Sequence, residues 1–261
     1  MTDSETQTET PAVAWTAGDD FVATIELRRP PNNFFSLDLI NGVADALFAI
    51  DDDPDCRAAV LCADGKHFCA GADFGGGGQR SYTTEDLYGA AVRVFRAKTP
   101  FVAAVQGAAI GGGLGLALSA DFRVAAPEAR FSANFARLGF HQGFGLSETL
   151  PALVGQQKAA ELLYTGRRIK GEEAAAIGMA DYLVPMSELR ARATELAAEI
   201  AGSAPLAVRE IRDTLRGDLA DRVRAATDHE GRVQGELQRT SDFAEGTRAM
   251  AERRPPNFTG Q

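Results

Sequence analysis

Residues 107–115 read Gly107-Ala108-Ala109-Ile110-Gly111-Gly112-Gly113-Leu114-Gly115 and lie between two apolar runs, 101–105 and 116–120. The first run has the length of a buried strand, and the second is typical of a buried helix. Glycines at the start of a helix leave backbone N–H groups without partners and with a partial positive charge. The stretch therefore predicts a strand, a turn and a helix, with N–H groups in the turn that can bind an anion or a polarised oxygen.

A second loop with small residues follows the apolar run 58–62 and reads His67-Phe68-Cys69-Ala70-Gly71-Ala72-Asp73-Phe74. Such residues let a ligand approach the backbone, and we expect the Ala72 N–H to point outward where the chain turns. Two N–H groups that converge on one oxygen form an oxyanion hole, and each donor contributes about 2.7–4 kcal/mol to a transition state with developing negative charge. Each loop taken alone is equally consistent with a turn that only packs a strand on a helix.

Strand and helix patterns alternate through the first half of the chain. Residues 21–27 alternate apolar and polar side chains, which predicts a strand. Ser36 can cap a helix whose apolar residues Ile40, Val43 and Leu47 are three or four positions apart. This alternation predicts an α/β protein.

From Ser147 onward the patterns are mostly helical. We expect a disordered acidic tail at 1–12, an α/β core at 13–204 and a C-terminal helical region at 205–261. The C-terminal region has too little apolar surface for a core of its own, so we expect it to pack on its own body or on a neighbouring subunit and to take part in oligomerisation.

Composition excludes several kinds of protein. The 261 residues carry a formal charge of −9, which argues against nucleic acid or an anionic membrane as a partner. No run of 18 apolar residues predicts a membrane helix, and the first ten residues are too polar and acidic for a signal peptide. Three cysteines without an export signal predict a cytoplasmic protein. The three histidines and three cysteines are scattered, so no metal site is expected.

Taken in order, these motifs resemble the crotonase superfamily, the enoyl-CoA hydratase/isomerase family. The resemblance spans residues 20–258 and is carried by Arg29-Pro30, Asn33, Asp53-Pro54, the segment 68–73, Gly107 with Gly111-Gly112-Gly113, the segment 120–125, Arg137-Leu138-Gly139, Leu150-Pro151, Thr165-Gly166, Glu173-Ala174, Gly178-Met179-Ala180, Glu245-Gly246 and the segment 252–255. It implies a spiral of ββα units with a C-terminal helical region, assembled as a homotrimer or a dimer of trimers. It also implies an acyl-CoA thioester as substrate, with coenzyme A as part of that substrate and no separate cofactor.

The resemblance implies roles for particular residues. It places the oxyanion hole at the N–H groups of Ala72 and Gly112. The segment 70–74 would line the pantetheine and adenine, and Arg254 and Phe258 would help form an adenine and phosphate pocket. The substrate-binding residues expected on this basis are Ala70, Gly71, Asp73, Phe74, Gly111, Phe135, Arg254 and Phe258.

The sequence departs from the family at the positions of its acids. By resemblance, the two glutamates of a hydratase would stand at Gly115 and Phe135, and an aspartate found in other members would stand at Gly143. None of these three side chains can transfer a proton, and general acid–base catalysis contributes about 10²–10⁴-fold to a rate. We therefore expect no efficient two-glutamate hydratase activity, and an apolar Phe135 favours a hydrophobic acyl group.

Three hypotheses remain open for the activity, which would be that of a lyase or isomerase if the protein turns over. First, another residue supplies the acid or base. His141 is one candidate, and its alternative role is that of a partly exposed loop histidine. Glu148 is the other, and its alternative role is that of a favourable charge at the start of a helix. Second, the chemistry needs mainly enolate stabilisation, as in decarboxylation. Third, the protein binds acyl-CoA without turnover, as a carrier or an inactive oligomer partner.

Overall fold

The computed structural model describes residues 11–73 and 82–261. The predicted tail up to residue 10, and the predicted site residue Phe74, lie outside the described residues. Ala12, which the sequence assigned to the tail, is buried, and its carbonyl accepts the Arg28 N–H at 2.7 Å. The ordered chain therefore includes at least one residue before the predicted core.

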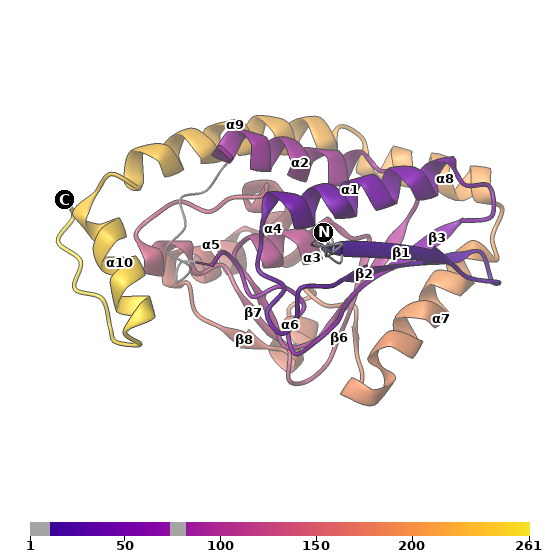
Figure 1. Ribbon diagram of the computed structural model, residues 1–261, viewed down its shortest axis with the longest axis horizontal. Helices are drawn as coiled ribbons and strands as arrows, with labels where there is room; N and C mark the ends of the chain where they lie inside the picture. The colour runs from indigo at the N-terminus through magenta and orange to yellow at the C-terminus, as the bar shows by residue number, and fades with distance from the viewer. Residues whose placement is uncertain (1–10, 74–81) are drawn as a thin grey trace, which may run out of the picture.

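Two sheets form the centre of the molecule (Figure 1). The larger has the strand order β1-β2-β3-β4-β6-β9, and all its pairs are parallel except β1 with β2. Its strands are β1 (Val13–Ala17), β2 (Val22–Leu27), β3 (Ala58–Ala63), β4 (Phe101–Val105), β6 (Phe122–Ala125) and β9 (Tyr182–Leu183). The smaller sheet contains β5 (Ala108–Ile110), β7 (Arg130–Ser132) and β8 (Ile169–Lys170).

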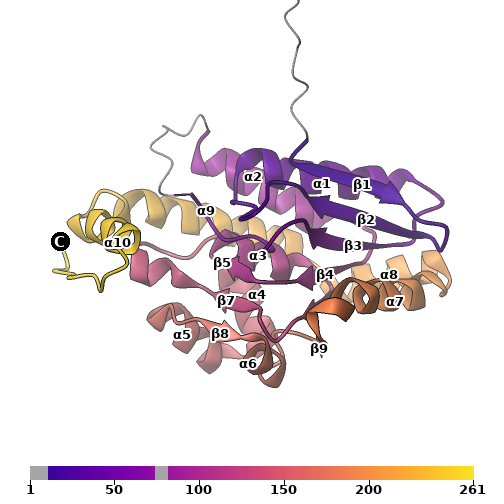
Figure 2. The same ribbon diagram turned by 60° about the horizontal axis from the view of Figure 1, so that its bottom comes forward.

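Helices cover both faces of the larger sheet. Every residue of β3 and β4 is buried, as expected for parallel strands enclosed on two sides. On one face lie α1 (Leu37–Asp52) and α2 (Thr84–Arg96), which are above the strands in Figure 1 and behind β1, β2 and β3 in Figure 2. On the other face, α7 (Leu189–Ala201) packs against β3 and β4. The predicted α/β fold class is confirmed.

Local features of the sequence fix the first residues of α1, α2 and α3. Ser36 caps α1 by accepting the Leu39 N–H, and Thr83 caps α2 in a capping box with Asp86. The helix α3 (Gly112–Ser119) begins four residues before the predicted apolar run, directly after Gly111 at φ +56°. Gly112 and Gly113 therefore belong to the first turn of the helix, and Gly111 is the turn residue directly before it.

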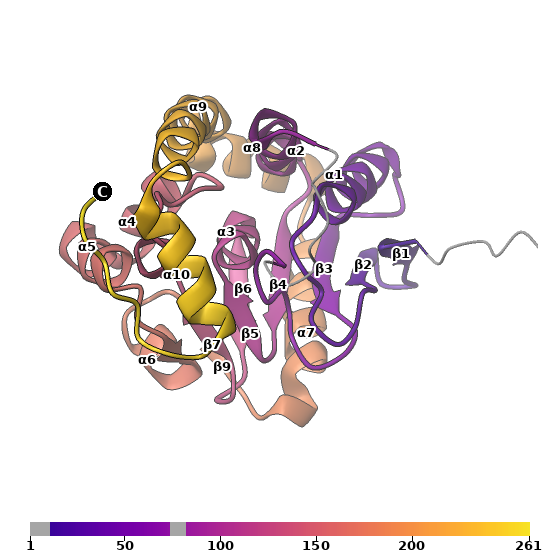
Figure 3. The same cartoon turned by 60° about the vertical axis from the view of Figure 1, so that its left-hand side comes forward.

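The C-terminal region packs on the body of its own chain, as one of the two expected alternatives stated. Helix α9 (Leu219–Leu237) lies against α2 and α4 (Leu146–Val154), as Figure 3 shows. Helix α10 (Ser241–Ala251) lies against the 3₁₀ helix η1 (Asn134–Leu138). The remaining elements are α5 (Gln156–Thr165), α6 (Gly171–Ala176), η2 (Met186–Glu188) and α8 (Pro205–Arg216). Among the described residues, no helix is long and apolar enough to span a membrane.

Candidate functional site

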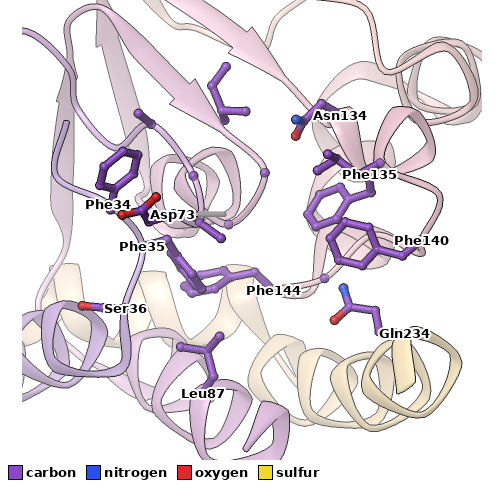
Figure 4. Close-up of a pocket in the computed structure, with 18 of the residues that line it drawn as sticks. Phe34, Phe35, Ser36, Asp73, Leu87, Asn134, Phe135, Phe140, Phe144 and Gln234 are labelled. Carbon is purple, nitrogen blue, oxygen red and sulfur yellow. The ribbon is translucent and has the colours of Figure 1, made fainter. Parts of the chain in front are cut away.

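A cavity of about 760 Å³ lies where α2, α3, η1, α9 and α10 meet (Figure 4). Apolar side chains supply somewhat more of its lining than polar ones do, and the two kinds together are what a ligand with an apolar and a polar part requires. The large apolar side chains in the lining are Phe34, Phe35, Leu87, Ile110, Phe135, Leu138, Phe140, Phe144, Phe243 and Met250.

The backbone N–H groups of Ala72 and Gly112 lie at the cavity and have no hydrogen-bond partner among the described residues. Ala72 follows Gly71, whose φ is +89°, and Gly112 is the first residue of α3. Both line the cavity, and within the described parts of the chain neither N–H donates to another group. The Gly112 N–H also lies at the positive end of a helix. Both donors therefore belong to the lining of the same cavity.

The two loops that carry these donors are fixed to each other through their backbones. Cys69 donates its N–H to the Ala108 carbonyl at 2.9 Å, and the Cys69 carbonyl accepts the Ile110 N–H at 3.1 Å. A Cβ placed on Gly113 would lie 2.3 Å from the Cys69 carbonyl oxygen, so only glycine allows this approach. Burial raises the pKa of the Cys69 thiol to about 12, which supports a packing role for that side chain.

Gly115 of α3 and Gly143 of the 139–145 loop are two of the positions where the resemblance expects an acid. At each of them, an aromatic side chain occupies the space that a side chain would need. A Cβ placed on Gly115 would lie 2.7 Å from the Cβ of Phe144. A Cβ placed on Gly143 would lie 1.9 Å from the Tyr88 hydroxyl oxygen, which donates to Gln234 Oε1 at 2.8 Å. Neither glycine can acquire a side chain unless its neighbour moves.

The structure brings most of the predicted binding residues together and leaves others outside. Those that line the cavity are Ala70, Gly71, Ala72, Asp73, Gly111, Gly112 and Phe135. Phe135 belongs to η1, and its ring meets that of Phe140 edge to face, with the centroids 5.4 Å apart. Asp73 is exposed and supplies the one carboxylate among the described lining residues.

The two predicted acid–base candidates do not reach the cavity. His141 turns its ring toward that of His229, with centroids 5.8 Å apart, and its Nδ1 lies 2.9 Å from the Gln142 carbonyl oxygen. The Glu148 carboxylate accepts a hydrogen bond from Arg222 at 3.1 Å. From the same loop, Phe140, Gly143 and Phe144 line the cavity instead.

The predicted adenine and phosphate residues also lie outside the lining. Arg254 donates to both carboxylate oxygens of Glu245, at 2.6 and 2.9 Å, and these bonds raise the pKa of Arg254. The same contacts, with those of Arg248, hold the pKa of Glu245 well below its usual range. Phe258 is exposed at the C-terminal end of the chain. The Arg254 guanidinium therefore serves an internal ion pair in this chain.

Several lining residues were not predicted as site residues from the sequence. The C-terminal region contributes Gln234 of α9, Gln238 directly after α9, and Phe243 and Met250 of α10. Their pattern in the sequence is that of any amphipathic helix, so it gave no sign that they face a ligand site. The rim also carries two exposed guanidinium groups, Arg130 and Arg168, and the His67 imidazole.

His67 is fixed as a neutral side chain. Its Nδ1 accepts the Ala108 N–H at 3.1 Å, which assigns the proton to Nε2. Partial burial, together with the positive charges of Lys66 and Arg130, lowers its pKa below 6.5. The side chain is therefore uncharged at neutral pH.

Glu230 of α9 anchors the loop that contains Gly143 and Phe144. Its buried carboxylate accepts the N–H groups of Gly145 and Ser147 at 2.9 and 3.1 Å, and the Ser147 hydroxyl at 2.7 Å. It thereby supplies the cap that α4 lacks in its own sequence, because Gly145 has no side chain. Burial raises the pKa of Glu230.

The two sheets, the C-terminal helices and the paired glycine loops define a crotonase-fold protein. The family model described as enoyl-CoA hydratase/isomerase matches residues 18–261, so the chain belongs to that family. The chain is 34% identical over 247 residues to a protein named crotonyl-CoA hydratase from Syntrophomonas wolfei, an alignment that covers 92% of this chain and 95% of that protein.

Solved structures show the same relationship. The crystal structure of an enoyl-CoA hydratase/isomerase from Pseudoalteromonas atlantica matches with a TM-score of 0.86 and 30% identity, covering 95% of this chain and 100% of that one. An enoyl-CoA hydratase from Mycobacterium avium subsp. paratuberculosis matches with a TM-score of 0.83 and 26% identity, covering 95% of this chain and 98% of that one.

Proposed function

We propose that the protein binds an acyl-CoA thioester, with the thioester oxygen at the N–H groups of Ala72 and Gly112 and the acyl group in the apolar cavity. The observation that carries this proposal is the pair of unpartnered donors at one cavity whose remaining wall is mainly apolar. A thioester has the complementary chemistry, because a polar carbonyl is attached to an apolar chain. The name of the Syntrophomonas relative, a crotonyl-CoA hydratase, supports the same substrate class.

The rim supports the coenzyme A part of the proposal. Arg130 and Arg168 expose their guanidinium groups at the edge of the cavity, although the chain as a whole carries a charge of −9. A local positive rim attracts phosphates by charge and by hydrogen bonding. In this proposal coenzyme A enters as part of the substrate, and the protein needs no other cofactor.

The chemistry proposed for the bound thioester is stabilisation of its enolate, which forms when the α-proton passes to solvent water and the electrons of the Cα–H bond move toward the thioester oxygen. Each N–H donor contributes about 2.7–4 kcal/mol when negative charge develops on the oxygen. Proton transfer by a pair of glutamates is not part of the proposal, because Gly115 and Phe135 occupy the positions where the resemblance expects the two glutamates. The one carboxylate among the described lining residues is that of the exposed Asp73.

A second candidate is binding without turnover, as an acyl-CoA carrier or a silent subunit in an oligomer. The apolar surroundings of the donors favour it, because Phe35, Phe135 and Phe144 offer no group that moves a proton. The two candidates share the same bound complex and differ only in whether the α-proton of the acyl group becomes exchangeable.

Calorimetry and proton exchange test both candidates. Hexanoyl-CoA should bind more tightly than coenzyme A alone; equal affinity would refute the proposed function. NMR in heavy water measures the exchange of the hexanoyl α-protons. Faster exchange in the presence of the protein supports enolate stabilisation, and an unchanged rate supports binding without turnover. Crotonyl-CoA should keep its conjugated-thioester absorbance, and loss at ordinary enzymatic rates of about 1–10³ s⁻¹ would contradict the expected absence of hydratase activity.

A further inference from the structure

Phe144 belongs to the lining of the cavity and has a backbone conformation that is unusual for a bulky residue. Its φ is +62°, and its side chain is fully buried. A side chain with a Cβ crowds the backbone in this left-handed region, so the conformation persists only where the surroundings fix it. The position of the Phe144 ring is therefore determined by its neighbours.

Two rings and one helix determine that position. The Phe144 ring lies edge-on to Phe35, with centroids 5.4 Å apart, and 6.1 Å from the centroid of Phe95. On its third side it meets the backbone of α3, where a Cβ on Gly115 would lie 2.7 Å from Phe144 Cβ and Cδ1. The ring thus fills the space that a side chain at position 115 would occupy.

This filled space lies close to the proposed oxyanion donors. The Phe35 ring covers the first residue of α3, because a Cβ on Gly112 would lie 2.8 Å from three of its ring carbons. Phe144 belongs to the cavity lining and lies next to Phe35, as Figure 4 shows. Its side chain has no exposed surface, so no water-sized space lies beside the ring or beyond it, and the open part of the cavity ends before the ring on the α3 side.

We propose that Phe144 is the specificity-determining residue of the site, because it closes the cavity and limits the length of an apolar acyl group. The inference rests on the proposed function, since it takes the acyl group to occupy the cavity. The substrate class is then an acyl-CoA whose unbranched chain ends above the Phe144 ring. Each methylene that finds apolar space improves affinity about fourfold, and each one beyond the closed end adds nothing.

The Gly115–Phe144 contact offers two matched variants. Phe144→Gly removes the ring and suits a positive φ, so it opens the cavity toward α3 without backbone strain. Gly115→Leu combined with Phe144→Gly fills the same space from the opposite side and should close the cavity again. Phe101→Leu is the control, because Phe101 is a buried ring of β4 that does not line the cavity.

The test measures the affinity of saturated acyl-CoAs from acetyl to hexadecanoyl, which cannot be hydrated, by calorimetry. For the unmodified protein, affinity should rise about fourfold per methylene and then level off at one chain length. Phe144→Gly should move that length upward by two or more carbons, the double variant should move it back, and Phe101→Leu should leave it unchanged. Phe144→Leu, with a smaller loss of packing, should move the limit less far.

The inference is overturned if affinity levels off at the same acyl-chain length in the unmodified protein, Phe144→Gly and Phe144→Leu. Thermal unfolding serves to show that both variants are folded. Continuous improvement up to hexadecanoyl in the unmodified protein would overturn it as well. Either result leaves the proposed function intact as long as acyl-CoA binds better than coenzyme A. Failure of the proposed function looks different, because every acyl-CoA then binds no better than coenzyme A.

Discussion

Replacing Gly112 by proline removes one proposed oxyanion donor without removing the helix that carries it. Proline has no N–H and is tolerated at the first position of a helix, which is where Gly112 stands in α3. The side chain also introduces a Cβ, which would lie 2.8 Å from carbons of the Phe35 ring. Gly112→Ala introduces the same Cβ and keeps the N–H, so it is the matched control.

The expected magnitude follows from the kind of hydrogen bond that is lost. A neutral hydrogen bond to the bound thioester is worth about 1 kcal/mol net, which is about fivefold in affinity. In a step that develops negative charge on the oxygen, loss of one donor costs about 2.7–4 kcal/mol, or about 10²–10³ in rate. Gly112→Pro should therefore weaken hexanoyl-CoA binding about fivefold relative to Gly112→Ala, and any α-proton exchange should fall much further.

Calorimetry with two ligands isolates the carbonyl contact. S-hexyl-CoA has the same chain length but no carbonyl oxygen, so both variants should bind it equally. If Gly112→Pro weakens both ligands to the same extent, the loss is one of packing against Phe35. If it weakens neither relative to Gly112→Ala, the Gly112 N–H does not contact the thioester and the reasoning fails.

Three other perturbations test the surroundings of the site. Gly143→Ala should lower the free energy of unfolding by about 1–3 kcal/mol, because its Cβ would collide with the Tyr88 hydroxyl. In a double-mutant cycle, Tyr88→Phe should recover part of this loss. Fully additive effects of the two substitutions would contradict the contact. Asn33→Ala should lower the free energy of unfolding in denaturant by about 1–3 kcal/mol, because the buried Asn33 amide donates to the Asp64 and His67 carbonyls at 2.7 and 2.8 Å. An unchanged denaturation midpoint would show that these two bonds do not stabilise the 64–67 loop. Glu230→Gln should change the pH dependence of stability. Because burial raises the folded pKa of Glu230 above its ordinary 4.5, its stabilising contribution is full below about pH 4.5 and declines as pH rises through the folded pKa. The stability advantage of the unmodified protein over Glu230→Gln should shrink between pH 4.5 and 7, and an advantage that grows over that range would show that the native state favours the ionised form.

Local signals in the sequence were enough for the sheet, several helix starts and the glycine loops. Buried runs such as β3 and β4 are apolar throughout because parallel strands are covered on both faces. Ser36 and Thr83 cap helices through their own side chains, which is a property of a few adjacent residues. The glycine turn before α3 was placed correctly, although the helix itself begins earlier than its apolar residues indicated.

The acid–base candidates show where such reasoning stops. His141 and Glu148 are near the expected site in sequence, but the direction of a side chain in an irregular loop depends on what packs against it. Here His229 and Arg222, both on α9, contact the two side chains that the sequence offered as candidates.

The sequence by itself determined the family and the α/β architecture, and it predicted that Ala72 and Gly112 lie at one site, because these depend on short motifs and on residues close together in the chain. Only the tertiary structure decided what occupies the space around the donors. Phe144 reaches the gap at Gly115 from a loop 29 positions later, and Gln234 of α9 hydrogen-bonds Tyr88 of α2 across 146 positions. Glycine in a sequence shows that a side chain is missing, but which neighbour fills its place is set by packing between distant elements.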